Sequence, residues 1–216
     1  LFFHYSLSVL YQSDAQYNRH SEQILPFVDT VLKESGLTLR DIDAIAFGAG
    51  PGAFTGLRVA CGVAQGLGWA TEKPLVAVSN LEAVAVKDQF EGRILVALDA
   101  RMKECYVAAY EVKGCFLCST LLEALVAKPE DLGALCERIG ATAVSGDAFN
   151  RYADCIDLPG GVRVLEKSPA TALEIAVLAK KRAQDGKTVT ALNAAPIYVR
   201  NRVALTIDER AKGVKL

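Results

Sequence analysis

The chain has 216 residues, of which 51% are hydrophobic and 23% are charged, and its formal net charge is −1. Such a chain can bury a large apolar core, and its near-zero charge argues against binding nucleic acid through a general electrostatic field. It has no apolar run near the roughly 20 residues that span a bilayer, and no basic segment with a cleavage site at its N-terminus. We therefore expect a cytoplasmic protein without membrane contact.

The first predicted elements are a strand and an amphipathic helix. Apolar and polar residues alternate over Ser6–Gln12, which is typical of a strand. The segment His20–Gly36 is predicted to be a helix that ends on a glycine cap. Ile24, Val28 and Val31 fall on one side of this helix, which makes that face apolar.

The next segments alternate between buried strands and helices. Ala44–Gly50 is apolar throughout and predicts a buried strand, and a glycine-rich turn leads from it into a helix over about residues 54–70. A second buried strand at Pro74–Val78 and a short helix at Asn80–Gln89 follow. This order is typical of a parallel α/β unit.

The pattern changes in the second half of the chain. Arg93–Ala100 and Cys105–Val112 predict an antiparallel hairpin. The remaining predicted elements are a helix around Pro129–Ile139, a strand at Ala141–Phe149, a helix from Thr171 to about Asp185, and a strand-like or extended segment at Ala195–Asn201. Together the elements predict an α/β protein of two lobes.

The six cysteines and two histidines offer few metal ligands. Cys115 and Cys118 form a CxxC pair, but no second pair follows, and a structural zinc site needs four ligands. We expect no metal site and reduced, mostly buried thiols.

The turn before the second predicted helix, AFGAGPGAFTG at residues 46–56, invites comparison with phosphate-binding loops. A Walker-type loop needs lysine after its last glycine, whereas Gly56 is followed by Leu57, which excludes this loop. A dinucleotide-binding turn needs an acidic residue at the end of the next strand, and Ser79 and Asn80 at that place disfavour it. A generic anion site at the helix amides and a purely structural turn both remain open.

The helix after the turn carries small residues on two faces. They form one stripe of four residues and one of two: Gly56, Ala60, Ala64 and Gly68, and Gly62 with Gly66. Each glycine inside a helix costs about 1 kcal/mol relative to alanine, so the stripes indicate close contact with another element. Packing within the chain and docking of a partner both remain open.

One long stretch of the sequence and several short ones resemble a known family. The string GPGAFTGLRVACGVAQGLGWA, followed by VAVSNLEAVA, resembles the TsaB (YeaZ) family, and HSEQILP, ALDARMKECY and APIYVRN agree with it. The likeness covers the chain from about His20 onward, and GPGxFTGxR is a far more specific pattern than a generic glycine turn. Members of this family are the bacterial partner subunits of the enzyme that makes N6-threonylcarbamoyladenosine in tRNA.

The resemblance implies the actin/Hsp70/sugar-kinase-like (RNase H-like) fold with two lobes. The N-terminal lobe would span residues 1–101, with about 193–216 returning to it, and the C-terminal lobe would span residues 102–192. The catalytic paralogue, TsaD, carries a metal-binding HxxxH motif, whose two positions fall on Asn80 and Val84 here. Because valine cannot ligate a metal, we expect an accessory subunit that is not an enzyme.

The resemblance also implies a function and partners. The chain would support a TsaD-like enzyme that transfers threonylcarbamoyl from its adenylate to N6 of adenosine 37, in tRNAs that read codons beginning with A. A TsaE-like ATPase would join the same complex, and the chain alone would be a homodimer. It would contact tRNA only indirectly. It would have no cofactor of its own, and ATP or ADP would bind only at the interface with the partner.

Two sets of candidate residues follow from the resemblance, and neither is catalytic. The candidates for a nucleotide or phosphate site are Gly50, Gly52, Phe54, Thr55, Gly56, Arg58 and Asp99. The candidates for the partner interface, on the two helices, are Ile24, Val28, Val31, Ala60, Gly62, Ala64 and Gly66.

The start of the chain departs from the family pattern. Family members open with a strand that ends in Asp-Thr, whereas this chain opens with LFFHYSLSVLY and has its first acidic residue at Asp14. Asp99 is then the acidic residue at a strand end near the expected cleft, as a phosphate-site group or as a turn-capping carboxylate. The alternative functions are a small ATPase or kinase of the same fold, which would use Asp99 and Asp147, and a dinucleotide-dependent oxidoreductase.

Overall fold

The computed structural model describes residues 20–165 and 170–200. The predicted strand at Ser6–Gln12 lies outside the described residues. Within the two described ranges, no helix has both the length and the apolar character that crossing a bilayer requires.

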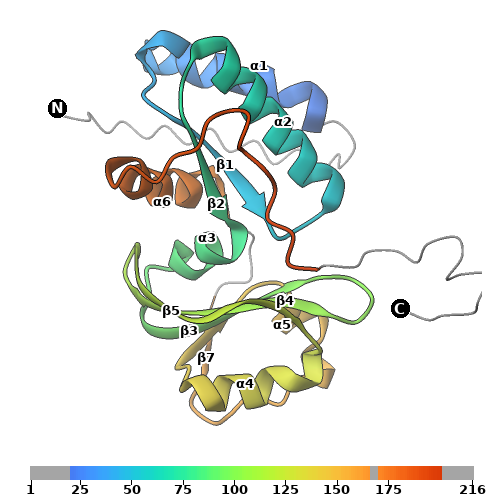
Figure 1. The fold of residues 1–216 in the computed structure, drawn as a ribbon. Helices are drawn as coiled ribbons and strands as arrows, with labels where there is room; N and C mark the ends of the chain where they lie inside the picture. Colours follow the sequence, from blue (N-terminus) through green and yellow to red (C-terminus); the bar gives the residue numbers. More distant parts are fainter. Residues whose placement is uncertain (1–19, 166–169, 201–216) are drawn as a thin grey trace, which may run out of the picture.

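A pair of parallel strands covered by helices forms one lobe (Figure 1). Its elements are α1 (His20–Ser35), β1 (Ile45–Gly50), α2 (Phe54–Thr71), β2 (Leu75–Ser79) and α3 (Asn80–Lys87), with a short 3-10 helix at Leu39–Asp41. Parallel strands need a crossover connection, and α2 supplies it between β1 and β2. The apolar runs predicted as buried strands and the helix between them are confirmed.

A five-stranded mixed sheet forms the second lobe, with the strand order β5-β4-β3-β6-β7. Its elements are β3 (Glu91–Asp99), β4 (Cys105–Lys113), β5 (Phe116–Ala127), α4 (Leu132–Ile139), β6 (Ala143–Ser145), α5 (Ala148–Arg151) and β7 (Arg163–Val164), with 3-10 helices at Pro129–Asp131 and Ala153–Cys155. β3, β4 and β5 are antiparallel, and β6 and β7 add in parallel. The predicted α/β class is confirmed.

The last helix, α6 (Ala172–Gln184), leaves the five-stranded sheet and packs against β1, β2 and α3. Arg182 fixes it there, because its guanidinium donates to the Ala77 carbonyl oxygen at 2.8 Å and pairs with the Glu82 carboxylate at 2.6 Å. Beyond α6, Val189 and Leu75 exchange two backbone hydrogen bonds of 2.8 Å. Although α6 falls within residues 102–192, it therefore contacts the strand pair of the other lobe.

One observed strand was not predicted, and one predicted strand is shorter than expected. No strand was predicted over β5, whose apolar residues do not alternate and whose pairing with β4 contains register shifts. The predicted strand Ala141–Phe149 is a strand only at β6, because the chain turns at Gly146 (φ +113°), where an added Cβ would lie 2.1 Å from the Ala97 carbonyl oxygen. The described part of the predicted segment Ala195–Asn201 is extended but belongs to no strand.

The two stripes of small residues on α2 face opposite environments. Ala64 and Gly68 are buried, and an added Cβ at Gly68 would lie 2.7 Å from the Leu75 side chain. Gly62 and Gly66 are exposed, and among the described residues nothing lies within 4 Å of a Cβ added to either. Packing of α2 on β2 thus explains Ala64 and Gly68 of the longer stripe, whereas Gly56 at its start is exposed like the two glycines of the shorter stripe.

This difference predicts opposite effects of alanine at two glycines of one helix. Gly66→Ala should raise the free energy of unfolding by about 0.5–1 kcal/mol, because alanine favours the helix and the site is open. Gly68→Ala should lower it by about 1–2 kcal/mol, because the added methyl overpacks Leu75 (fully buried) and the Lys73 carbonyl oxygen 3.2 Å away. Urea unfolding of both variants measures the difference; equal effects would contradict the assignment of the two faces.

Candidate functional site

The glycine turn is shaped by close contacts within the chain. Gly50 has a φ of +118°, and a Cβ added there would lie 2.8 Å from the Ile197 carbonyl oxygen and 2.9 Å from Leu57 Cδ1. A Cβ added to Gly48 would lie 2.6 Å from the Asn80 amide oxygen. The structural interpretation left open by the sequence therefore accounts for both glycines without a ligand.

Asn80, the first residue of α3, holds the turn in place. Its side-chain amide donates to the Pro51 carbonyl oxygen at 3.0 Å. Ser79 caps α3, since its hydroxyl accepts from the Leu81 amide and the Glu82 carboxylate accepts from its own amide. Four residues after Asn80, Val84 is 2% exposed and lies in the core. Of the two positions at which the resemblance led us to expect the counterpart of a metal motif, one is thus a structural amide and the other is a core valine.

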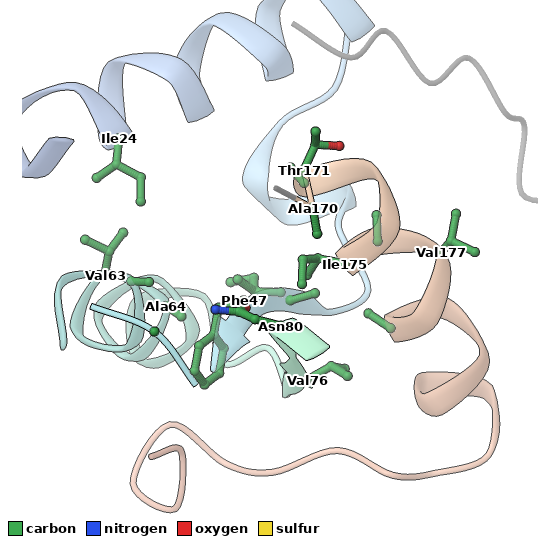
Figure 2. A pocket seen from close by; sticks show the side chains of 18 of the residues that line it. Ile24, Phe47, Val63, Ala64, Val76, Asn80, Ala170, Thr171, Ile175 and Val177 are labelled. Atoms are coloured by element: carbon green, nitrogen blue, oxygen red, sulfur yellow. The ribbon is translucent and has the colours of Figure 1, made fainter. Parts of the chain in front are cut away.

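A groove of about 2080 Å³ opens between the two lobes and between α2 and α6. Gly52 and Phe54 from the glycine turn line it, as do Asn80 and Asp99. Figure 2 shows its apolar part, with Ile24 and Val63 on one side and Ile175 on the other. The groove is therefore shared by the glycine turn and by Asp99, the two parts of the predicted nucleotide or phosphate site.

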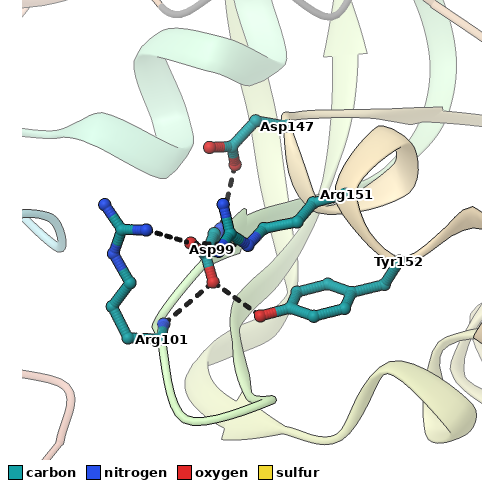
Figure 3. A network of polar contacts seen from close by, with 5 residues as sticks. All are labelled: Asp99, Arg101, Asp147, Arg151 and Tyr152. Carbon is teal, nitrogen blue, oxygen red and sulfur yellow. Dashed lines mark hydrogen bonds and ion pairs between the residues drawn. The ribbon is translucent and has the colours of Figure 1, made fainter.

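Asp99, at the end of β3, is the centre of a polar cluster (Figure 3). One carboxylate oxygen accepts from the Arg101 amide at 2.9 Å and from the Tyr152 hydroxyl at 2.7 Å. The other lies 3.3 Å from the Arg101 guanidinium and 3.2 Å from that of Arg151. The Asp99 amide donates to Asp147 at 2.9 Å, which ties the second acidic candidate to the same cluster.

The Asp99 cluster acts as a structural clamp next to the turn of the β3–β4 hairpin. The Asp99 side chain is only 6% exposed, whereas the two arginines are mostly exposed. Burial, with the hydrogen bond to Asp99 adding to it, raises the pKa of the Tyr152 hydroxyl, which therefore remains a donor at neutral pH. Because both Asp99 oxygens have donors within the chain, the turn-capping interpretation accounts for this residue.

At the start of α2, three side chains stack on the surface. The Arg58 guanidinium lies 3.8 Å from the centre of the Phe54 ring, and the Tyr198 ring lies 5.8 Å from it. Arg58 Nε donates to the Tyr198 hydroxyl at 3.4 Å. Thr55 and Gly56 are exposed beside this stack. Tyr198 was not among the predicted site residues, because only the fold brings it to Phe54.

The predicted interface residues divide into inward and outward groups. Ile24, Val28 and Ala60 line the groove, and Ala64 is 3% exposed, so the structure places Ala64 in the core rather than on a partner surface. The outward group is Val31, which is 40% exposed, together with Gly62 and Gly66.

One exposed side chain of α2 was missed. Trp69 is 68% exposed and lies on the outward stripe that runs through Phe54, Arg58, Gly62 and Gly66. The spacing of four, four, four and three residues could have identified it, since such residues share a helix face. We call the five residues of this stripe the α2 face.

The cysteines are all free. Cys61, Cys105 and Cys136 are buried, so the prediction of buried thiols holds for these three, while Cys118 and Cys155 are exposed. Burial raises the pKa of the Cys105 thiol to about 12, and nearby carboxylates, Asp99 first, add to the shift. Among the described residues, no three His, Cys, Asp or Glu side chains gather closely enough to hold a metal ion.

Comparison with known proteins gives consistent matches. Residues 14–156 match the model of TsaD, tRNA N6-adenosine threonylcarbamoyltransferase. The tRNA threonylcarbamoyladenosine biosynthesis protein TsaB of Escherichia coli (strain K12) is 35% identical over 86% of this chain and 82% of the relative. The protein of the same name from Haemophilus influenzae is 33% identical over 92% and 89%, respectively.

A solved structure matches the fold as well. YeaZ from Pseudomonas aeruginosa superposes with a TM-score of 0.74 at 32% sequence identity, over 83% of this chain and 84% of that chain. Together with the family match, this superposition confirms the predicted actin-like fold class.

The Asp99 cluster predicts the effect of removing one charge. Asp99→Asn should lower the free energy of unfolding by about 1–3 kcal/mol, because the buried carboxylate loses its charge-assisted bonds. Asp154→Asn, which changes an exposed carboxylate on the same lobe, is the matched control and should have no measurable effect. Thermal and urea unfolding compare the two; equal stability of the Asp99 variant and the wild type would exclude the clamp.

Proposed function

The chain belongs to the TsaB family of tRNA threonylcarbamoyladenosine biosynthesis proteins, and from this premise we propose that it is the non-catalytic partner of a TsaD-like enzyme. It acts in the formation of threonylcarbamoyladenosine in tRNA. The proposed enzyme transfers threonylcarbamoyl from its adenylate to N6 of adenosine 37, and this chain supports its active state.

The observation that carries the non-catalytic role is the pair Asn80 and Val84. Val84 is buried in the core and offers no ligand atom, and the Asn80 amide is bound to the Pro51 carbonyl oxygen. Asp99 and Asp147, which an independent ATPase or kinase would need, are bonded within their own cluster. These contacts favour the partner role over the ATPase or kinase function.

The α2 face is the proposed docking surface. Two exposed aromatic residues, Phe54 and Trp69, lie at its ends, and between them are two glycines at which an added Cβ would meet no atom of the described residues within 4 Å. Small residues let a second helix approach closely, and buried aromatic and arginine side chains supply most of the binding energy in many interfaces. On α1, the exposed apolar side chains of Phe27 and Val31 are included in the proposed docking surface.

The remaining partners are also proposals. Phe54, Thr55 and Arg58 are exposed at the N-terminus of the 18-residue helix α2, which suits ATP or ADP at the joint with the partner. A TsaE-like ATPase in the complex, a homodimer of the free chain and only indirect contact with tRNA complete the proposed assembly.

The docking surface predicts that Gly62→Leu weakens the complex. The leucine side chain would enter the space that a partner helix needs, and we expect the dissociation constant to rise by about 100-fold or more. Ala134→Leu, at an exposed position of α4, is the matched control and should leave binding unchanged. Calorimetric titration with the TsaD-like subunit measures both; wild-type affinity in the Gly62 variant would contradict the assigned face.

The function itself predicts a loss of modified nucleoside. In cells depleted of this protein, mass spectrometry of tRNA nucleosides should show a collapse of threonylcarbamoyladenosine. Supplying Asp99→Asn should restore the signal, because that residue has no proposed chemical role, whereas Gly62→Leu should not. An undiminished signal in depleted cells would contradict the proposed function.

A further inference from the structure

An extended segment crosses the first lobe and ends at the β3–β4 hairpin of the second. It comprises residues 194–200, which we call the strap, and it is the red trace in Figure 1. Gln65 on α2 donates to the Ala194 carbonyl oxygen at 2.9 Å, and the Ile197 amide donates to the Ala49 carbonyl oxygen at 2.7 Å. The Ile197 carbonyl lies where a side chain at Gly50 would be. The strap is therefore held on α2 and on the glycine turn.

The middle of the strap forms part of the surface beside α2. Tyr198 packs on Phe54 and accepts a hydrogen bond from Arg58, as described above. Phe54, Arg58 and Tyr198 are all exposed, so a partner that covers the N-terminal end of the α2 face also covers Tyr198.

The end of the strap holds the tip of the hairpin. The Arg200 guanidinium pairs with Glu104 at 2.5 Å, contacts Met102 Sδ at 3.7 Å, and lies 5.9 Å from the centre of the Tyr106 ring. Its side chain is 14% exposed. At this tip, the backbone of residues 101–103 is left-handed, with φ values of 63°, 56° and 56°. Such a conformation in non-glycine residues needs support from surrounding contacts.

We propose that the strap couples the α2 face to the β3–β4 hairpin, so that a helix docked on Phe54 and Arg58 stabilises the hairpin tip at the joint between the lobes. Tyr198 and Arg200 are two residues apart in an extended chain, a span of about 7 Å. Because an extended backbone cannot lengthen, a shift of Tyr198 moves Arg200 and its bonds to Glu104 and Met102. The identity of the docking partner rests on the proposed function, whereas the coupling belongs to the chain itself.

The first test measures hydrogen exchange of the free, full-length chain by mass spectrometry. Tyr198→Ala and Arg58→Ala should each speed exchange of the amides in residues 99–105 by at least about fivefold, although the ring and hydrogen-bond contacts described for both residues are with each other and with Phe54. Trp69→Ala is the matched control, since it removes an exposed aromatic residue of the same helix for which the described residues show no ring contact or hydrogen bond with Tyr198. Unchanged exchange in both test variants would overturn the proposal.

A double-variant cycle separates coupling from general loosening. Arg200→Ala should itself speed exchange at the hairpin tip, and adding Tyr198→Ala should then produce no further increase. Rate increases that simply multiply would mean that the two sites act independently, and the proposal would be wrong.

The second test adds the TsaD-like subunit. Exchange in residues 54–69 should slow in the wild type and in Arg200→Ala, but exchange in residues 99–105 should slow only in the wild type. Equal slowing of the hairpin in both would overturn the coupling. If the subunit does not bind at all, the proposed function fails, and the free-chain cycle still decides the coupling.

Discussion

The arrangement of this molecule depends on the absence of a side chain at Gly50. The Ile197 carbonyl and the Leu57 side chain occupy the space that a Cβ would need, and Gly48 is constrained in the same way by Asn80. The end of β1 and the start of α2 therefore meet the first residue of α3 and the strap at one junction. The direction of α2, and with it the position of its outward face, follows from this junction. The same junction also places Arg200 where it contacts the β3–β4 hairpin of the other lobe.

Polar groups that could serve chemistry are used here for structure. Asn80 lies beside the groove, yet its side-chain amide donates to the Pro51 carbonyl oxygen. Asp99 ends a strand beside the groove, yet its two oxygens are bonded to Arg101, Arg151 and Tyr152. A buried polar group with all its partners in place stabilises one arrangement of the elements around it. Both side chains therefore hold neighbouring elements of this fold in place.

The local pattern of apolar and polar residues predicted most of the strands and helices, but it predicted fewer of the contacts at the candidate site. β1, α2, β2 and α3 were predicted because burial on both faces gives apolar runs and a helix gives a regular spacing. β5 was missed because a bulged strand breaks the alternation by which strands are recognised. The order of the elements predicted two lobes and the glycines marked the turn, whereas the actin-like fold class came from the family resemblance, whose most specific stretch covers the junction described above.

Long-range contacts explain what the sequence could not reveal about the site. Ala64 and Gly62 are both small, and only the packing of α2 on β2 decides that Ala64 faces inward and Gly62 is exposed. Arg58 and Tyr198 are 140 positions apart, so no local spacing links them. The structural role of Asn80 likewise depends on Pro51, which lies 29 positions earlier.

The two outward glycines of α2 also bear on the stability of the isolated chain. Each lowers the stability of the helix by about 1 kcal/mol relative to alanine, and among the described residues no atom lies close enough to require a glycine there. A partner on the α2 face, as proposed above, would bind the folded form and so raise its apparent stability. In the proposed assembly, part of the stability of this chain would therefore be supplied by its partner.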